Sequence, residues 1–347
     1  MSPDHIAGWD LGGAHLKVAC MDAEGYVLGS AQLPCPLWQG VDHLRRGIDL
    51  ALETLEFAGE RHAVTMTGEL VDLFSSRREG VRTLISVMEE HLRPRTIHWY
   101  AGVHGFLNSD ETVNAEHAVA SSNWLAGATF VARCLPRALF VDIGSTTTDI
   151  IPIRDGVVVA RGSNDNDRLR FGEMLYTGAV RTPLMALARR APFMGAWIPQ
   201  MTEHFAVTAD VYRLTGELPE HADQLPSADN GPKSPVASAR RVARMLGLDL
   251  EAASLDDWRQ LACYYRERQL HAIACALHQV VSDRAVDASA PLVGCGVGRF
   301  LVRHLAQRCG RTYIDMASLL KTERLRIGDP ADCVPAVAVA GLARCWS

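Results

Sequence analysis

The sequence predicts an α/β protein built from two similar domains, and three observations support this fold class. An apolar strand that ends in Asp-x-Gly occurs twice, once over residues 6–12 and once over residues 138–144. In both copies a tight turn, a second strand, a glycine-containing turn and a third strand follow. Alternating helices and strands come next in each half. This order is typical of a mixed sheet covered on both faces.

The first half continues from this three-stranded pattern in a regular way. The interval from the aspartate to the second turn is similar in both copies, Asp10 to Gly25 and Asp142 to Gly156. Residues 41–58 have the apolar periodicity of a helix. The further elements predicted for this half are a strand at 63–66, a helix at 81–91, a strand at 96–100 and a helix at 114–134.

The second half repeats the pattern around a long intervening segment. We predict a helix near 172–190 and then a largely helical segment at about 191–288, in which the polar stretch 219–235 forms an exposed loop. The pattern resumes with a strand at 291–294, a helix at 299–308, a strand at 312–315 and a helix at 335–345. We therefore expect a first domain over 1–136, a second over 137–347 with a helical insertion, and a cleft between them.

Composition and charge exclude several function classes. Of the 347 residues, 48% are apolar and 22% are charged, which is ordinary for a globular protein. The net charge of −5 gives no reason to expect nucleic acid or an anionic membrane as a partner. The N-terminus lacks a basic region followed by an apolar run, and no apolar stretch approaches the roughly 20 residues that cross a bilayer. We expect a cytoplasmic protein; the sequence does not indicate its oligomeric state.

The nine cysteines and thirteen histidines show no metal-binding pattern. No two cysteines have the two-residue spacing of a zinc or redox site, and no His-Glu-x-x-His segment occurs. Free thiols in a reducing compartment are the interpretation that fits best.

The glycine turns of the two hairpins suit phosphate binding. Gly12, Gly13 and Gly144 allow the backbone to approach an oxyanion closely and to direct consecutive N–H groups at it. The hydroxyls of Ser145, Thr146 and Thr147 add donors. Asp10 and Asp142 end their strands, where a carboxylate can hold Mg²⁺ through water. Two such hairpins facing each other could hold a polyphosphate and its metal from both sides.

Each of these features also has a simpler interpretation. A single glycine-rich hairpin is often a turn with nothing bound, and only its repetition favours a phosphate site. Lys17 could reach a phosphate or be a solvated lysine on an edge strand. His15 could donate into the cleft or lie on the sheet surface.

A third glycine cluster follows a predicted strand and opens a helix, at residues 293–299. Gly294 and Gly296 could place a nucleotide or another anion at the helix N-terminus. The segment lacks the acidic residue that follows a Rossmann fingerprint, and the chain has no Walker lysine motif. Alone, this cluster is a weak indication.

Together, the doubled hairpin and the late glycine-rich turn resemble the superfamily of actin, Hsp70 and the acetate and sugar kinases. The resemblance covers nearly the whole chain apart from the insertion. It implies two ribonuclease-H-like domains, phosphate loops at 10–17 and 142–149, and an adenosine-type loop at 294–298.

Within this superfamily, the segment from Asp142 to Asp149 resembles the hydantoinase and oxoprolinase branch. Other segments are similar to the hydantoinase-related proteins of methanofuran and methylofuran biosynthesis, which belong to tetrahydromethanopterin-linked one-carbon metabolism. These segments are Gly8-Trp-Asp-Leu-Gly-Gly-Ala-His-Leu-Lys17, Met66-Thr-Gly-Glu-Leu-Val-Asp72, Ser122-Asn-Trp-Leu-Ala126 and Tyr176-Thr-Gly-Ala-Val-Arg-Thr-Pro183.

This resemblance implies a transferase. In that family an aminomethylfuran carrying a diphosphate is joined to the phenol oxygen of a glutamyl-tyramine or tyrosine-like acceptor, with loss of pyrophosphate. Two departures from the kinases, Ala14-His15 in the first loop and Ser145 in the second, speak against ATP hydrolysis but not against phosphate binding. They leave open whether ATP is bound.

The implied reaction assigns roles to several residues. Mg²⁺ at Asp10 and Asp142, together with Lys17, would stabilise the charge of the leaving diphosphate. The phenol has a pKa of about 10 and needs a base, for which Glu69 and Asp142 are the candidates. Glu69 could instead be a carboxylate at a helix N-terminus.

Acceptor binding is assigned to three further residues. Asn123, like Trp124 beside it, could contact the substrate, or both could belong to a helix packed between the domains. Tyr176 and Arg181 could hold an acceptor carboxylate or lie on the surface.

Two other functions compete with the ether synthase. A small-molecule kinase would form ADP when a hydroxyl acceptor is present. A nucleotide-driven switch of the actin or chaperone type would form no small-molecule product, and the absence of a peptide-binding β-domain speaks against it.

Overall fold

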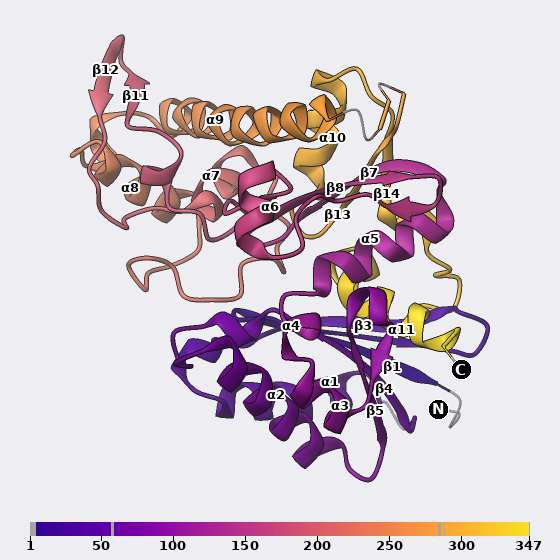
Figure 1. Ribbon diagram of the computed structural model, residues 1–347. Helices are drawn as coiled ribbons and strands as arrows, with labels where there is room; N and C mark the ends of the chain where they lie inside the picture. Colours follow the sequence, from indigo (N-terminus) through magenta and orange to yellow (C-terminus); the bar gives the residue numbers. More distant parts are fainter. Residues whose placement is uncertain (1–4, 57–58, 284–285, 288, 347) are drawn as a thin grey trace. The chain divides into compact units, whose positions relative to one another are not determined.

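The structure is a computed structural model that describes residues 5–346 except 57–58, 284–285 and 288 (Figure 1). The chain forms two compact units, which are described separately. Unit 1 comprises Met1–Ala138, Ile153–Val159 and Asp315–Ser347, and unit 2 comprises Leu139–Pro152 and Ala160–Ile314.

Unit 1 is built on a sheet of mixed strands in the order β3-β2-β1-β4-β5-β6. The first three form the predicted meander, and β4 pairs with β1 in parallel. The strands are β1 (Ile6–Leu11), β2 (His15–Met21), β3 (Val27–Pro34), β4 (Arg61–Met66), β5 (Thr96–Tyr100) and β6 (Phe106–Leu107).

Helices cover both faces of this sheet. On one face, α1 and α2 bury residues such as Leu44 and Leu84 against Trp9 and Leu11 of β1. On the other face, α11 packs on β1, β2, β4 and α5. A Cβ atom on Gly8 would lie 1.9 Å from the Ala336 carbonyl oxygen, so glycine is required for this close approach. The helices of this unit are α1 (Asp42–Thr54), α2 (Arg77–Leu92), α3 (Ser109–Asn114), α4 (Glu116–Val119), α5 (Asn123–Cys134) and α11 (Val334–Arg344).

Two features of unit 1 differ from the sequence predictions. The helix α11 belongs to this unit, although the predicted second domain extended over 137–347. The reason is its composition, because residues 334–343 are all buried and need apolar neighbours on every side. The predicted helix at 114–134 is interrupted between α4 and α5, where Ser121 has a φ of 49°.

Unit 2 repeats the strand order of unit 1. Its sheet runs β10-β8-β7-β13-β14, with β9 also paired to β8, so β7, β8 and β13 correspond to β1, β2 and β4. The parallel pairing of β13 with β7 places Cys295 beside Asp142. The strands of this sheet are β7 (Arg137–Ile143), β8 (Thr148–Arg154), β10 (Met174–Leu175), β13 (Leu292–Cys295) and β14 (Tyr313–Asp315), and β9 (Val157–Val158) lies in the residues assigned to unit 1.

Among the described residues between β10 and β13 there are three α-helices, of which α9 is the longest. It packs against α7, α8 and α10 and buries large side chains such as Trp258 and Tyr265. A hairpin, β11 (Arg190–Phe193) and β12 (Ala196–Pro199), precedes these helices and was not predicted. The helices of unit 2 are α6 (Asp165–Phe171), α7 (Thr208–Thr215), α8 (Pro235–Met245), α9 (Leu255–Ser282) and α10 (Arg299–Arg308).

The prediction of a helix near 172–190 is wrong. Only a short 3-10 helix, Leu184–Ala186, forms between β10 and β11. Gly178 and Pro183 are poor helix formers, and the backbone between them bonds to the turn that follows β7 instead.

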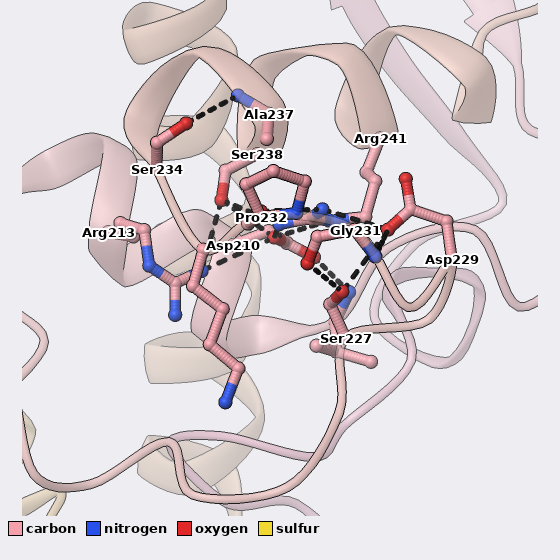
Figure 2. Close-up of polar contacts among 12 residues, drawn as sticks. Asp210, Arg213, Ser227, Asp229, Gly231, Pro232, Ser234, Ala237, Ser238 and Arg241 are labelled. Carbon is pink, nitrogen blue, oxygen red and sulfur yellow. Dashed lines mark hydrogen bonds and ion pairs between the residues drawn. The ribbon is translucent and has the colours of Figure 1, made fainter.

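The polar stretch 219–235 is a loop as predicted, and hydrogen bonds from a buried arginine hold it in place. Arg241 of α8 is fully buried, and its guanidinium donates to Asp210 at 2.9 Å and to Asp229 of the loop at 3.0 Å (Figure 2). Arg241 also donates to the carbonyl of Pro232 at 3.2 Å. A buried guanidinium with several acceptors fixes its partners, since leaving either charge unpaired would be costly.

In the described part of the chain no helix combines the length and the apolar character that crossing a bilayer requires. The structure describes all nine cysteines and places none of them in a disulfide, and four of them are buried.

Candidate functional site

The first glycine turn connects β1 to β2 and is fixed from behind by backbone hydrogen bonds. The Gly12 N–H donates to the His15 carbonyl at 3.1 Å, which closes the turn. The Gly13 carbonyl accepts from the Leu37 N–H at 3.0 Å, and the Ala14 carbonyl accepts from the Cys35 N–H at 2.9 Å. The chain that follows β3 therefore holds the turn, and His15 is buried at the start of β2.

The segment after β4 packs against the same turn. The Thr67 N–H donates to the Leu11 carbonyl at 3.0 Å, and a Cβ atom on Gly68 would lie 3.0 Å from that oxygen. Next to it, Glu69 is 1% exposed and accepts a hydrogen bond from the Ser121 hydroxyl at 2.9 Å. Glu69 lies in the first turn of a short 3-10 helix, Gly68–Leu70, and not at the start of α2, which begins at Arg77.

Asp10 lies on the face of β1 that carries Gly8. It is 3% exposed, and its neighbours across the strands are Lys17 on β2 and Thr65 on β4. The amide nitrogen of Asn123, at the start of α5, lies 3.5 Å from an Asp10 oxygen. The Asn123 oxygen is held by the Trp124 N–H at 2.7 Å, which points the amide nitrogen toward Asp10.

Lys17 is not on an edge strand. It is partly buried, and β2 lies between β3 and β1. The interpretation as a solvated edge-strand lysine therefore does not apply, and a cation and a carboxylate share one region of unit 1.

Sequence reasoning missed the acidic residues that precede α11. Asp332 is 2% exposed, and burial raises the pKa of the adjacent Cys333 thiol to about 12. The positive charge of Lys17 lowers that pKa, whereas the negative charges of Asp332 and Asp10 raise it, so these groups share one neighbourhood. The available signal was Asp329-Pro-Ala-Asp332 directly before an apolar helix.

The second glycine turn connects β7 to β8 in unit 2. The Gly144 N–H donates to the Thr147 carbonyl at 3.0 Å. The Gly144 carbonyl accepts from the Ala179 N–H at 2.9 Å, and the Ser145 carbonyl accepts from the Arg181 N–H at 2.9 Å. A segment thirty residues further along the chain therefore holds this turn.

Gly178 brings that segment into direct contact with the turn. A Cβ atom on Gly178 would lie 2.5 Å from the Thr146 nitrogen, so no other residue fits without moving the backbone. The Arg181 guanidinium lies 3.4 Å from the Thr146 hydroxyl, and burial lowers the pKa of Arg181 below its usual range. Tyr176 is 72% exposed at the start of this segment. Arg181 thus lies at the turn, and Tyr176 projects into solvent.

The third glycine cluster packs against Asp142, which is 8% exposed. Gly296 has a φ of +77°, and a Cβ atom there would lie 2.3 Å from an Asp142 oxygen. The Gly298 N–H donates to the Ile143 carbonyl at 2.8 Å. Gly294 faces the Tyr313 ring, and a Cβ atom on Gly294 would lie 2.7 Å from that ring. Close packing alone accounts for glycine at 294 and 296.

A buried ion pair lies beside the second turn and was not predicted. Arg168 is 2% exposed and pairs with Asp149, the last residue of the Asp142–Asp149 segment. Burial raises the pKa of Asp149 to about 6, the Arg168 charge opposes this rise, and the Asp142 charge adds to it. Asp149 and Asp142 are therefore close enough to interact electrostatically.

The predicted residues thus form two groups, one in each unit. Unit 1 brings Asp10, Lys17 and Asn123 together, with Glu69 beside the first turn. Unit 2 brings Asp142, Ser145, Thr146 and Arg181 together, with the glycine cluster behind Asp142. Within the described residues no group of three or more carboxylate, histidine or cysteine ligands could hold a metal ion by itself.

Comparison with known proteins decides the family. The hydantoinase/oxoprolinase family model matches residues 60–319. The chain belongs to the hydantoinase/oxoprolinase family. The resemblance predicted from the sequence is confirmed.

Two relatives of this family member are each named (4-{4-[2-(gamma-L-glutamylamino)ethyl]phenoxymethyl}furan-2-yl)methanamine synthase. The protein of Methanocaldococcus jannaschii is 32% identical over 254 residues, which is 73% of this chain and 74% of that protein. The protein of Methanococcus vannielii is 34% identical over 139 residues, 40% of this chain and 62% of that protein.

Among solved structures, a nucleotide-free acetone carboxylase, an enzyme of ATP-dependent acetone carboxylation, is similar with a TM-score of 0.61 and 10% identity. The similarity covers 96% of this chain and 70% of that one. At this identity the likeness concerns the fold alone, and it agrees with the mixed α/β sheets described above.

Proposed function

We propose that this family member is a transferase of methanofuran or methylofuran biosynthesis that acts in the cytoplasm. It would condense an aminomethylfuran diphosphate with the phenol oxygen of a glutamyl-tyramine or tyrosine-like acceptor. The names of the two relatives support the product, a phenoxymethyl-furan ether. One structural observation carries the proposal, namely that a buried aspartate ends the equivalent strand before a glycine turn in both units.

Diphosphate binding is assigned to the two turns. In this proposal the two units are ribonuclease-H-like domains, the segment 191–288 is an insertion in the second, and each turn can bind a diphosphate. Backbone N–H groups at the turns, with the hydroxyls of Ser145 and Thr146, would donate to its oxygens. These donors are fixed before the substrate binds, so little reorganisation is needed when charge develops.

The enzyme must stabilise the negative charge that develops on the leaving diphosphate. The bond from the furfuryl carbon to the diphosphate oxygen breaks, the bond from that carbon to the phenol oxygen forms, and the electron pair stays with pyrophosphate. Lys17 and Arg181, one at each turn, would neutralise part of that charge.

Mg²⁺ is compatible with the carboxylates present. Magnesium keeps several waters and usually binds through one or two carboxylates plus substrate phosphates, so a three-ligand protein cluster is not required. Asp10 and Asp142 are the residues that would hold it. When bound, Mg²⁺ would supply Lewis-acid stabilisation of the leaving group.

The phenol proton needs an acceptor near the reacting carbon. Glu69 is a buried carboxylate beside the first turn, held by Ser121, and we assign the proton to it. Asp142 is the alternative base. Asn123 and Tyr176 are assigned to the acceptor, Asn123 for its position beside Asp10 and Tyr176 for its exposed ring.

The test is ³¹P NMR of the protein with Mg²⁺ and either ATP or a furfuryl diphosphate, with and without a phenolic acceptor. Pyrophosphate that appears only with both the diphosphate and the acceptor is the expected result. Formation of ADP with a hydroxyl acceptor would replace the proposal by the kinase. Filaments that form with ATP in a concentration-dependent way, without any product, would replace it by the nucleotide switch.

A further inference from the structure

The position of the second glycine turn depends on the segment Thr177–Thr182, which packs on it. Gly178 lies against the backbone of Ser145 and Thr146, and the N–H groups of Val180 and Arg181 both donate to the Ser145 carbonyl, at 3.1 and 2.9 Å. Backbone packed against backbone transmits a shift directly, because no flexible side chain lies between them to absorb it.

This segment is held from its other side by one glutamine of α9. Gln269 is 0% exposed, and its amide nitrogen donates to the Thr177 hydroxyl at 2.8 Å and to the Gly178 carbonyl at 2.8 Å. Its amide oxygen accepts from the Tyr212 hydroxyl. Both N–H groups and the oxygen of the side chain are therefore used, which fixes its orientation.

Three threonines complete the support without replacing the glutamine. The Thr208 hydroxyl donates to the Gly178 carbonyl at 2.9 Å, and the Gly178 N–H donates to the Thr182 hydroxyl at 2.8 Å. The Thr148 hydroxyl donates to the Thr177 carbonyl at 2.7 Å. Thr182 belongs to the segment itself, Thr208 to α7 and Thr148 to β8, whereas Gln269 ties the segment to the long helix α9.

We propose that Gln269 is a positioning residue that holds the second glycine turn in its diphosphate-binding geometry through Thr177 and Gly178. The inference rests on the proposed function. It also gives α9, part of the intervening helical segment, a role in positioning the second glycine turn. Gln269 touches no substrate in this proposal and acts only through the backbone of Gly178.

The main experiment compares Gln269→Leu with Gln279→Leu. Gln279 is an exposed glutamine on the same helix, whose amide donates to the Arg170 carbonyl at 2.9 Å, away from the turn. We expect Gln269→Leu to lower kcat/KM for the furfuryl diphosphate by about tenfold to 100-fold, since a displacement of about 1 Å can cost that much. The KM for the phenolic acceptor and the activity of Gln279→Leu should stay near wild type.

A second readout needs no substrate. Hydrogen exchange of the amides of Ala179, Val180 and Arg181, which bond to the turn, should be at least about tenfold faster in Gln269→Leu than in wild type. Exchange in β1 and β4 of unit 1 should be unchanged. Gln279→Leu should leave all of these rates as they are.

A conservative variant gives a signature that a general loss of packing would not give. In Gln269→Glu the carboxylate still accepts from Tyr212 but cannot donate to the Gly178 carbonyl. Protonation restores one donor, and burial raises the pKa of such a carboxyl. The KM of Gln269→Glu for the diphosphate, relative to wild type, should therefore fall as the pH is lowered, while that of Gln269→Leu should not.

The outcomes separate this inference from the proposed function. If wild type releases pyrophosphate and Gln269→Leu keeps the wild-type kcat/KM and the wild-type exchange at 179–181, the positioning role is refuted. If kcat/KM falls equally for both substrates with no pH dependence in Gln269→Glu, the residue is merely structural. If wild type releases no pyrophosphate at all, the proposed function fails, and the exchange rates still test whether Gln269 holds the turn.

Discussion

The two glycine turns follow the same strand pattern, but different parts of the chain hold them in place. The first turn is held by Cys35 and Leu37, which follow β3, and the segment after β4 packs against it through Thr67. The second is held by Gly178 and Arg181 and, behind them, by Gln269 of α9. Repeating a hairpin in sequence therefore repeats the turn but not its support.

This difference predicts where each turn is sensitive. Changes at Gly178 or Gln269 should disturb the second turn and leave the first intact. The two turns can therefore be tested against each other with matched substitutions.

The largest effect is expected from the strand-ending aspartates. Asp142→Asn and Asp10→Asn should each lower pyrophosphate release by about 100- to 1,000-fold, because each removes a carboxylate that would hold the Mg²⁺ ion, whose positive charge stabilises the leaving group. Melting curves and far-UV circular dichroism should show a retained fold. Asp155→Asn, on the exposed turn after β8, is the matched control and should keep wild-type activity. Wild-type turnover by Asp142→Asn would remove that residue from the mechanism.

The next effect compares the two turns directly through their glycines. Gly178→Ala places a Cβ atom 2.5 Å from the Thr146 nitrogen, whereas Gly13→Ala places one 2.8 Å from the Val71 side chain, which can shift. We expect kcat/KM to fall about 100-fold for Gly178→Ala and less than about tenfold for Gly13→Ala.

The double variant Gly13→Ala with Val71→Ala makes room for the new methyl group and should recover most of that smaller loss. Equal losses in Gly13→Ala and Gly178→Ala would mean that the two turns are held equally rigidly.

A smaller effect separates the cations at the two turns. Lys17→Met and Arg181→Met should each raise the KM for the furfuryl diphosphate by about tenfold, the cost of losing a hydrogen bond to a charged group. The penalty should shrink at high salt, which screens the charges. Arg154→Met, which removes an exposed arginine at the end of β8, is the control. If Arg181→Met raises the KM for the phenolic acceptor instead, Arg181 binds an acceptor carboxylate.

The smallest effect concerns the core of unit 1 alone. Burial lowers the pKa of His62 to about 3, and its Nδ1 accepts from the Trp9 indole N–H at 3.0 Å. The folded state keeps His62 neutral while the unfolded chain takes up a proton below about pH 6.5, so stability falls as the pH decreases from 6.5 toward 3. Between pH 7 and pH 5.5 this residue should cost about 1 kcal/mol of the free energy of unfolding.

Hydrogen exchange of the backbone amides, measured as a function of pH, reports the stability of unit 1 through β1 and of unit 2 through β7. Protection of β1 should weaken toward acid in wild type more than in His62→Gln, whose amide oxygen can still accept from Trp9. An identical pH response of the two proteins would show that His62 does not control the acid stability of unit 1.

Much of the fold could be predicted because the relevant signals are local. The meander β1–β3, the strand β5 and the helix α10 follow directly from apolar periodicity and from turn glycines. The two glycine turns were predicted for the same reason, since aspartate, glycine and hydroxyl residues adjoin in sequence. The family was predicted from short segments around those turns.

The support of the second turn could not be predicted, because it depends on contacts between distant residues. Gln269 and Thr177 are 92 positions apart, and a glutamine within a helix has no special pattern around it. The segment 172–190 was predicted as a helix, but the turn after β7 uses its backbone N–H groups. Likewise, a fully apolar helix such as α11 does not reveal which sheet it will cover.

The sequence by itself determined the strands of the first meander and the position of both glycine turns, since each of these depends on neighbours within a few residues. Only the tertiary structure decided that α11 completes unit 1 and that Gln269 stands behind Gly178. Burial and hydrogen bonding act between whatever groups the fold brings together, and their distance along the chain does not enter the energy of the contact.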